Sequence, residues 1–298
     1  MRTSTERLVQ TNGVRLRVTE AGTPGDPVII LAHGFPELAY SWRHQIPVLA
    51  AAGYHVLAPD ERGYGGSTCP EAIEDYDIHA LSGDLIGLLD DVGAERAVFV
   101  GHDWGALVVW QTALLHPGRV AAAAGLSVPP VPRARSLPTE AWRRKFGEDF
   151  YMLQFQEPGP ADTAMGADPA ATMRGLFAGT PEGPLPDWIS AGEFDFYVTE
   201  FTRTGFTGGL NWYRNYDRNW ATTPHLADAT FTVPALFVGG TADPVLGTMR
   251  PERAGEVAAG PYRAEMIEGA GHWIQQDSAD EVNRILLEFL SSLEPFDS

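Results

Sequence analysis

Cysteine and positive charge are both scarce in this chain. Cys69 is the only cysteine among 298 residues, so neither an internal disulfide nor a cysteine-based metal site can form. Lysine and arginine together number 21 against 39 aspartates and glutamates, which gives a formal net charge of −18. Such an acidic chain repels phosphate backbones and anionic lipid surfaces. We therefore expect neither nucleic acid nor a membrane surface to be a partner.

Long apolar runs and cofactor motifs are also missing. The polar residues 1–7 lead directly into an alternating segment, without the apolar stretch of a signal peptide, and no run is long enough to span a bilayer. These absences favour a cytoplasmic protein. No residue spacing indicates a metal, a nucleotide or an organic cofactor, so we expect none. The sequence leaves the oligomeric state open, with a homodimer as one outcome.

The apolar residues that are present follow the pattern of an α/β protein. Residues 8–18 alternate around Asn12-Gly13, which predicts a β-hairpin. Short, nearly continuous apolar runs follow and predict strands buried on both faces of a parallel sheet; they lie at 28–32, 55–58, 97–100 and 234–238. Apolar stripes with helical spacing occur at 81–92 and 282–293. Together these patterns predict a mostly parallel, doubly wound α/β sheet.

The alternation of strands and helices is interrupted between residues 129 and 223. This segment is rich in proline, glycine and aromatic residues and contains no run typical of a buried strand. We predict that residues 129–223 form an inserted, mainly helical cap (lid) domain, and that residues 1–128 and 224–298 form the core domain. The aromatic side chains of the cap provide enough surface to cover an apolar pocket.

A sharp turn is predicted where the run at 97–100 meets the next helix. Its sequence, Gly101-His102-Asp103-Trp104-Gly105, has the form of a nucleophile elbow, a strained strand-to-helix turn that needs small residues two before and two after its centre. A carboxylate at that centre suits attack at a saturated carbon, which leaves an alkyl ester that water can hydrolyse. The leaving atom is then an epoxide oxygen or a halide. An alternative is a simple tight turn in which Asp103 caps the helix.

Hydrolysis of an alkyl ester near neutral pH needs a general base. His272 lies in a loop before the last helix, at the expected carboxyl edge of the sheet, although a surface-loop histidine is the alternative. Asp243 follows the strand run at 234–238 and could hold His272 in the required tautomer. The backbone amides of Phe35 and Trp104 could form an oxyanion hole. The glycine-rich loop 60–67 is expected to be structural.

With these motifs, the chain resembles soluble epoxide hydrolases of the α/β-hydrolase superfamily over nearly its whole length. The matching segments are 33–36, 101–105, 150–159 and 211–215. The resemblance implies an α/β-hydrolase fold and a small-molecule epoxide as substrate. It also implies that Tyr151 and Tyr213, one from each cap segment, donate hydrogen bonds to the epoxide oxygen. Neutral phenols, with a pKa near ~10, can polarise that oxygen and then supply a proton. Phe35, Trp104 and Phe155 are expected to contact the substrate.

Two other functions use the same fold. Haloalkane dehalogenases resemble this chain in the Asp-Trp pair but commonly have Asn at the position of Phe35, whose side chain cannot donate a hydrogen bond to halide. Fluoroacetate dehalogenases resemble it less, since they prefer Arg where Trp104 stands. An esterase would require Ser at position 103. A non-catalytic ligand-binding member of the fold is the alternative from a different class, since fold alone does not imply activity.

Overall fold

A central eight-stranded sheet organises residues 4–296, the part of the chain that the computed structural model describes. The strand order is β1-β2-β4-β3-β5-β6-β7-β8, with β1, β2 and β4 paired antiparallel and all other neighbours parallel. The predicted hairpin and the mostly parallel α/β sheet are therefore confirmed. The strands are β1 Thr5–Thr11, β2 Val14–Ala21, β3 Val28–Ala32, β4 His55–Pro59, β5 Ala97–His102, β6 Val120–Leu126, β7 Ala235–Gly240 and β8 Tyr262–Ile267.

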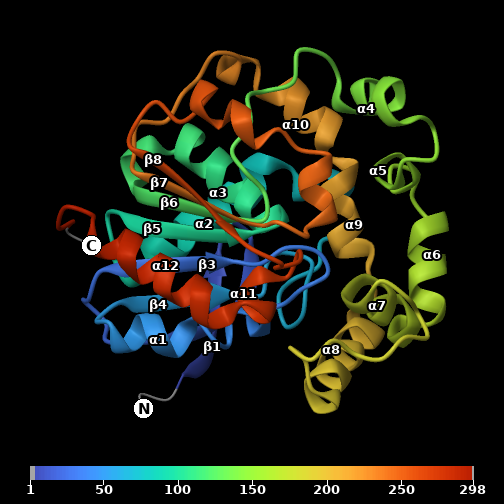
Figure 1. Cartoon of the computed structure of the whole chain (residues 1–298), viewed down its shortest axis with the longest axis horizontal. Helices are drawn as coiled ribbons and strands as arrows, with labels where there is room; N and C mark the ends of the chain where they lie inside the picture. The colour runs from blue at the N-terminus through green and yellow to red at the C-terminus, as the bar shows by residue number, and fades with distance from the viewer. Residues whose placement is uncertain (1–3, 297–298) are drawn as a thin grey trace.

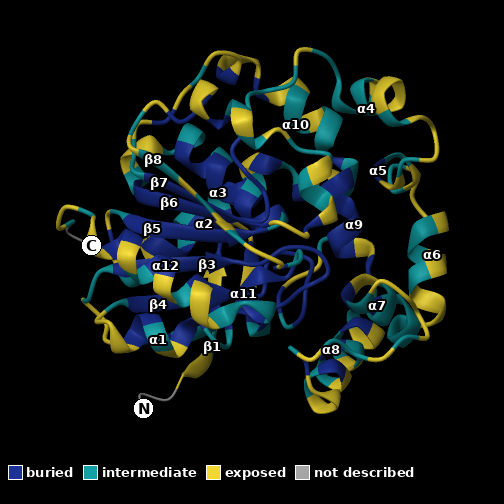
Figure 2. Cartoon of the chain, in the orientation of Figure 1, coloured by how far each residue is buried: buried dark blue, intermediate teal, exposed yellow. Residues whose placement is uncertain are grey.

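The strands in the middle of the sheet are buried along their whole length. Every residue of β3, β4, β5, β6 and β7 is buried, as the continuous apolar runs predict for strands covered on both faces. Figure 2 shows this central part of the sheet in the colour of buried residues. The strand predicted at 234–238 begins at Ala235 instead, because Pro234 has no amide hydrogen to donate to a neighbouring strand.

Helices cover the sheet on both faces. The apolar side chains of α1 (Ile46–Ala51) and α12 (Ala279–Ser291) pack on one face, and those of α2 (Ile78–Val92) and α3 (Trp104–Leu115) pack on the other. Asp77 caps α2 by accepting a hydrogen bond from the Ala80 amide, and Gly93 ends this helix with a left-handed backbone. The short helix α11 (Ile274–Asp277) precedes α12. Both sheet faces are therefore covered, as in a doubly wound fold.

Between β6 and β7 the described chain forms helices and loops, with one isolated β-bridge between Phe231 and Ala258. The α-helices are α4 Pro138–Phe146, α5 Tyr151–Gln154, α6 Pro160–Ala167, α7 Pro169–Ala178, α8 Ala191–Thr204, α9 Thr207–Arg214 and α10 Tyr216–Thr222. Figure 1 shows α4 to α8 on the right of the view, beyond the end of the sheet. Two ion pairs connect α8 with the part that contains the sheet: Arg43 with Glu193 at 2.6 Å and Arg17 with Glu200 at 3.3 Å. We refer to residues 129–223 as the cap.

Residues 4–296 contain neither a membrane-spanning helix nor a cluster of metal-ligating side chains. None of the helices there combines the length and the apolar character that a membrane span requires. That part of the chain also contains no group of three or more histidine, cysteine or acidic side chains placed to hold a metal ion. Cys69 is exposed and free.

Candidate active site

Asp103 occupies a strained turn between β5 and α3. Its backbone has φ 51° and ψ −118°, which an L-residue rarely adopts. A Cβ on Gly101 would lie 2.3 Å from the backbone of Gly105, and one on Gly105 would lie 2.1 Å from the carbonyl oxygen of Ala32. Both positions therefore require glycine. The Asp103 side chain makes no capping hydrogen bond to α3, so the interpretation of Asp103 as a helix cap is wrong.

His272 lies between two carboxylates from different strand ends. Its Nδ1 is 3.0 Å from Oδ2 of Asp243, which follows β7, and its Nε2 is 3.6 Å from Oδ2 of Asp103. The Asp243 side chain is completely buried, and its other oxygen accepts a hydrogen bond from the Val245 amide at 2.8 Å. The structure thus brings the predicted nucleophile, base and acid together, with the imidazole oriented by Asp243 and facing Asp103.

The charges of the three residues are strongly coupled. Burial lowers the pKa of His272, but hydrogen bonds and the negative charges of Asp103 and Asp243 outweigh burial and raise it to about 10. For Asp103, burial raises the pKa, and the hydrogen bond and charge of His272 reverse this effect, so that the pKa is lowered. Near neutral pH the site therefore contains a carboxylate beside an imidazolium. Each charge stabilises the other in a largely water-excluded position.

The carboxylate of Asp103 also faces the loop after β3. The Phe35 amide donates a hydrogen bond to Oδ1 of Asp103 at 2.9 Å. Gly34 permits this approach, because a Cβ at that position would lie 2.5 Å from the same oxygen. The amide of Trp104 belongs to the peptide directly after Asp103, at the first position of α3. One carboxylate oxygen is thus held by the backbone, and the other faces the imidazole.

Tyr151 and Tyr213 reach the site from α5 and α9 of the cap. Their ring centroids are 6.4 Å apart, and Phe155 packs against both rings, at 5.5 Å and 5.2 Å. Tyr213 also packs edge-on against Phe35 at 5.5 Å and Trp104 at 5.1 Å. Burial and then the charge of Asp103 raise the pKa of both phenols above the ordinary value, so both stay protonated. The predicted contact residues therefore surround the two phenols.

Three further polar residues hold the loop of His272, although no sequence pattern indicated this role for them. The backbone carbonyl of His272 accepts a hydrogen bond from Ser127 Oγ at 2.7 Å and lies 2.8 Å from Nε2 of His102. The other ring nitrogen of His102 lies 2.6 Å from Glu37, and both of these side chains are fully buried. Glu37 also accepts hydrogen bonds from two side chains of α11, Gln275 and Gln276. His102 lies within the elbow segment 101–105, and Glu37 directly follows the segment 33–36. Titratable side chains beside these apolar segments could have indicated a buried polar contact.

Known proteins resemble this chain over almost its whole length. The model of the α/β hydrolase fold family matches residues 27–279. Epoxide hydrolase A of Mycobacterium tuberculosis (strain ATCC 25618 / H37Rv) is 63% identical, covering 97% of this chain and 98% of that protein. Epoxide hydrolase 1 of Siraitia grosvenorii is 37% identical, covering 95% and 96%. The crystal structure of epoxide hydrolase A from Mycobacterium thermoresistibile superposes with a TM-score of 0.96 at 63% identity, covering 99% of this chain and all of that one. The chain belongs to the α/β-hydrolase fold family and, within it, to the epoxide hydrolases, which are hydrolases that act on ether bonds.

Proposed function

We propose that this protein converts an epoxide and water into a vicinal diol through an alkyl ester on Asp103. The observation that carries the proposal is the position of Asp103, a carboxylate at the centre of a nucleophile elbow with an imidazole on one side and two protonated phenols on the other. This combination provides a nucleophile for carbon, acids for the oxygen that leaves carbon, and a base for the ester.

Ring opening is the first step. Oδ2 of Asp103 attacks a ring carbon, because Oδ1 already accepts the Phe35 amide and becomes the carbonyl oxygen of the ester. The carbon–oxygen bond of the ring breaks, and its electron pair stays on oxygen. Tyr151 or Tyr213 transfers a proton to this oxygen, and the other phenol stabilises it by hydrogen bonding. The products are an alkyl ester with a neighbouring hydroxyl group, and a tyrosinate.

His272 becomes available as a base only after this step. In the free enzyme, two carboxylates hold its pKa at about 10, so that the ring is protonated. Formation of the ester removes the charge of Asp103, which lowers the pKa of His272. The phenols have pKa values above the ordinary value, so the tyrosinate takes the proton that the imidazolium of His272 loses, and the imidazole becomes neutral. Alkylation thus converts His272 from a partner of the nucleophile into a general base.

Hydrolysis of the ester is the second step. His272, held by Asp243, takes a proton from water, and the resulting hydroxide attacks the carboxyl carbon of Asp103. The amides of Phe35 and Trp104 stabilise the oxyanion. Its collapse breaks the ester bond and releases the diol alkoxide, which takes the proton of the new carboxylic acid. Asp103 is again a carboxylate, and His272 is again an imidazolium.

A single turnover in water enriched in oxygen-18 tests this scheme. Because water attacks the carboxyl carbon, the label should enter Asp103 in the first turnover, and the diol should be unlabelled. Mass spectrometry of the diol and of a peptide containing Asp103 separates the two positions. Label in the first diol released would mean that water attacks the epoxide directly, which contradicts the ester.

A paired assay tests the alternatives with the same fold. Diol formation from aryl and alkyl epoxides is measured beside halide release from haloalkanes of the same carbon skeleton. Diol without halide supports the proposal, and halide without diol assigns the protein to the dehalogenases. Binding of epoxides without either product would favour a ligand-binding protein. The apolar side chain of Phe35, which packs on Tyr213 and offers no donor to halide, favours the first outcome.

A further inference from the structure

Three residues other than glycine have a positive φ within residues 4–296: Asn12, Asp103 and Ser127. Asn12 lies with Gly13 in the turn of the first hairpin, where asparagine commonly adopts this backbone. Asp103 is the centre of the nucleophile elbow. Ser127 has φ 64° and is completely buried, and it follows β6 rather than lying in a hairpin turn. Its backbone conformation therefore needs a separate explanation.

Serine is an unfavourable residue for the backbone at position 127. The side chain of an L-residue crowds the backbone at positive φ, and glycine adopts the same conformation without this strain. Strained residues persist only where the surrounding structure holds them, and they cluster at functional sites. The strain at Ser127 thus indicates that its side chain has a role that glycine cannot fill.

Ser127 lies between the strands that carry the nucleophile and the acid. It directly follows β6, which is paired with β5 on one side and with β7 on the other. Asp103 follows β5, and Asp243 follows β7. The Ser127 amide donates to the Val238 carbonyl of β7 at 2.8 Å, and the Asp103 amide donates to the Leu126 carbonyl of β6 at 3.2 Å. The ends of the three strands are therefore connected to one another beside the candidate site.

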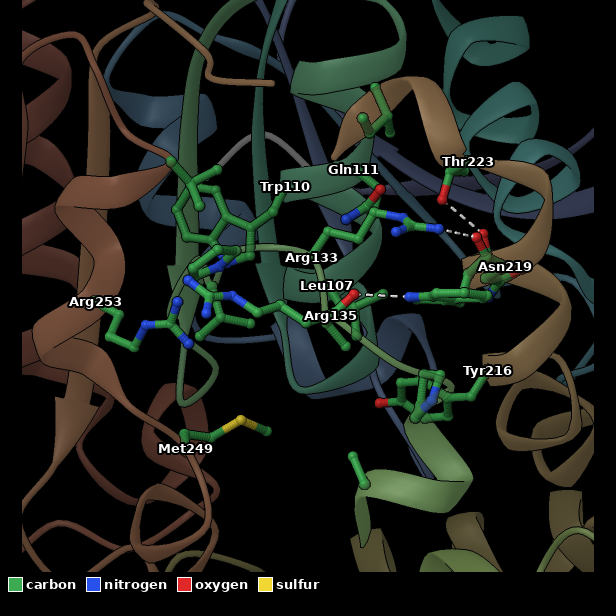
Figure 3. A pocket seen from close by; sticks show the side chains of 18 of the residues that line it. Leu107, Trp110, Gln111, Arg133, Arg135, Tyr216, Asn219, Thr223, Met249 and Arg253 are labelled. Atoms are coloured by element: carbon green, nitrogen blue, oxygen red, sulfur yellow. Dashed lines mark hydrogen bonds between the residues drawn. The ribbon is translucent and has the colours of Figure 1, made fainter. Parts of the chain in front are cut away.

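The segment around Ser127 is also held by Trp110 of α3. The indole Nε1 donates to the Val128 carbonyl at 3.0 Å, and the ring lies so close to Gly125 that a Cβ there would be 2.3 Å from it. Figure 3 shows Trp110 at the wall of a cavity of about 780 Å³, which Val128 also lines. Contacts from α3 and from the neighbouring strands thus fix the end of β6, and with it the position of the Ser127 side chain.

The hydroxyl of Ser127 donates a hydrogen bond to the backbone carbonyl of His272 at 2.7 Å. Nε2 of His102 lies 2.8 Å from the same oxygen. His272 follows Gly269-Ala270-Gly271, in which Gly269 has φ 76°, and glycine gives a chain little preference for one conformation. Contacts from outside this loop, such as those at the His272 carbonyl, therefore help to determine where the imidazole lies.

The ring of His272 has two further contacts, and the proposed reaction weakens one of them. Nδ1 lies 3.0 Å from Asp243, and Nε2 lies 3.6 Å from Asp103. Once Asp103 carries the ester, its charge no longer attracts the ring. The imidazole is then positioned by Asp243 and by the contacts of its own backbone, at the stage when it has to activate water. A small displacement of a catalytic group can slow a reaction strongly.

We propose that Ser127 is a positioning residue for ester hydrolysis: its hydroxyl anchors the His272 carbonyl and keeps the imidazole aligned with water after Asp103 has been esterified. The inference rests on the proposed function and adds a residue to its second step. During ring opening the charge of Asp103 still holds the imidazole, so Ser127 should matter little for that step. The role of the hydroxyl also explains why a strained serine occupies a position whose backbone suits glycine.

Two substitutions separate the hydroxyl from the backbone strain. Ser127→Ala removes the hydroxyl and keeps the strain, whereas Ser127→Gly removes both. In single-turnover experiments, ester decay should slow about tenfold in both variants, while ester formation stays within about twofold of wild type. Ser127→Gly should melt at a higher temperature than Ser127→Ala, because glycine relieves the strain. Equal decay rates at unequal stability are a result that a merely structural role would not give.

Asn12→Gly is the matched control. It also places glycine at a residue with positive φ and removes side-chain hydrogen bonds, but the partners of Asn12 are Ala80 and Asp84 of α2. Both steps should keep their wild-type rates in this variant. Wild-type ester decay in both Ser127 variants would overturn the proposal. Slow decay in Ser127→Ala alone would overturn it too, because the backbone rather than the hydroxyl would then control His272.

A spectroscopic measurement tests the anchor without any turnover. Asp103→Asn removes the charge at position 103, as the ester does, and leaves Nδ1–H of His272 hydrogen bonded to Asp243. The low-field proton resonance of this hydrogen bond, identified by its absence in His272→Gln, should shift or broaden when Ser127→Ala is added to Asp103→Asn. An unchanged resonance would overturn the proposal. A wild-type protein that forms no ester from any epoxide would instead overturn the proposed function, and the resonance tests the anchor in either case.

Discussion

The two halves of the candidate active site, one from the sheet and one from the cap, are held in place by different interactions. On the sheet side, hydrogen bonds fix each charged group: Asp103 accepts from Phe35, and His272 is oriented by Asp243. On the cap side, Tyr151 and Tyr213 are held by ring contacts, and Tyr151 is 39% exposed whereas Tyr213 is 4% exposed. The sheet side thus positions its charged groups by hydrogen bonds, whereas the cap positions its two neutral phenols by packing of aromatic rings.

We expect the largest effect from His272→Gln, which should slow ester hydrolysis but not ring opening. In His272→Gln, Asp103 and both phenols remain, so the epoxide should still be opened, but the ester should lose its general base. We expect ester hydrolysis to slow by about 10²–10⁴-fold, so that the ester accumulates. Quenched-flow mass spectrometry of a peptide containing Asp103 measures the ester. Asp103→Asn is the control, and its peptide should show no added mass from an ester. If the peptide from His272→Gln is also unmodified, the two-step scheme is contradicted.

Substitutions on the cap side should give the opposite pattern. Tyr213→Phe and Tyr151→Phe each remove one donor to the epoxide oxygen, and we expect each to slow ester formation about tenfold to a hundredfold. The double variant should lose more, about 10² or beyond, because no general acid is left. Tyr213→Phe should have the larger effect, since Tyr213 is more deeply buried and hydrogen bonds there are less screened.

The rate of ester decay in the same single-turnover experiment checks this assignment. Decay should be unchanged in each single phenylalanine variant, because the tyrosine that remains can still take the proton that His272 loses after the ester forms. Tyr54→Phe, at a partly buried tyrosine of the core between α1 and β4, is the control and should leave both steps unchanged. A slower decay in Tyr213→Phe would show that the cap also takes part in ester hydrolysis and would remove the distinction between the halves.

The pH dependence of the two steps should differ as well. In the free enzyme the pKa of His272 is raised to about 10, but in the alkyl-enzyme only Asp243 remains to raise it. Since the neutral imidazole is the base, the rate of ester decay should increase with pH and reach a plateau. The midpoint of this increase, which reports the pKa of His272 in the alkyl-enzyme, should lie well below 10. Decay rates of preformed ester across a pH series give this midpoint. A midpoint near 10 would mean that the charge of Asp103 does not control His272.

The positions of the sheet half of the candidate site can be predicted from the sequence, because its residues lie in loops that follow strands. Asp103 follows β5 and Asp243 follows β7, and parallel strands place such loops at one edge. The support of His272 could not be predicted in the same way. Glu37 and His102 are 65 positions apart, and Glu37 and Gln275 are 238 apart, so only the folded chain shows that they touch.

The cap half is harder to predict, and the reason is physical. Nothing in the local sequence distinguishes Tyr151 from the other aromatic residues of the cap, and its role was inferred from a family resemblance. Arg133 lies in a proline-rich loop with no regular pattern. Its contact with the ring of Trp220 depends on how α10 packs over that loop, and such packing is not encoded in any short motif.

Two buried glutamates near the carboxyl edge of the sheet differ in their hydrogen-bond partners. Glu37 accepts hydrogen bonds from two glutamines and pairs with His102, whereas neither carboxylate oxygen of Glu61 has a hydrogen-bond partner in the described part of the chain. Burial, followed by the charges of Asp84 and Asp60, raises the pKa of Glu61 well above 4.5. Glu61 is therefore a buried carboxyl without the polar contacts that Glu37 has, and it should destabilise the fold.

Glu61→Met should raise the free energy of unfolding by about 1–3 kcal/mol, because it removes a buried polar group that lacks partners. The gain should depend on pH. Below 4.5 the carboxyl is protonated in both the folded and the unfolded chain; above 4.5 the unfolded chain loses its proton first, so wild type loses stability as pH rises toward the folded pKa. Urea denaturation at acidic and neutral pH measures this difference, with Glu71→Met on the surface as the control, expected to change stability by less than about 0.5 kcal/mol. Equal or lower stability of Glu61→Met at neutral pH would show that the buried carboxyl of Glu61 does not destabilise the fold.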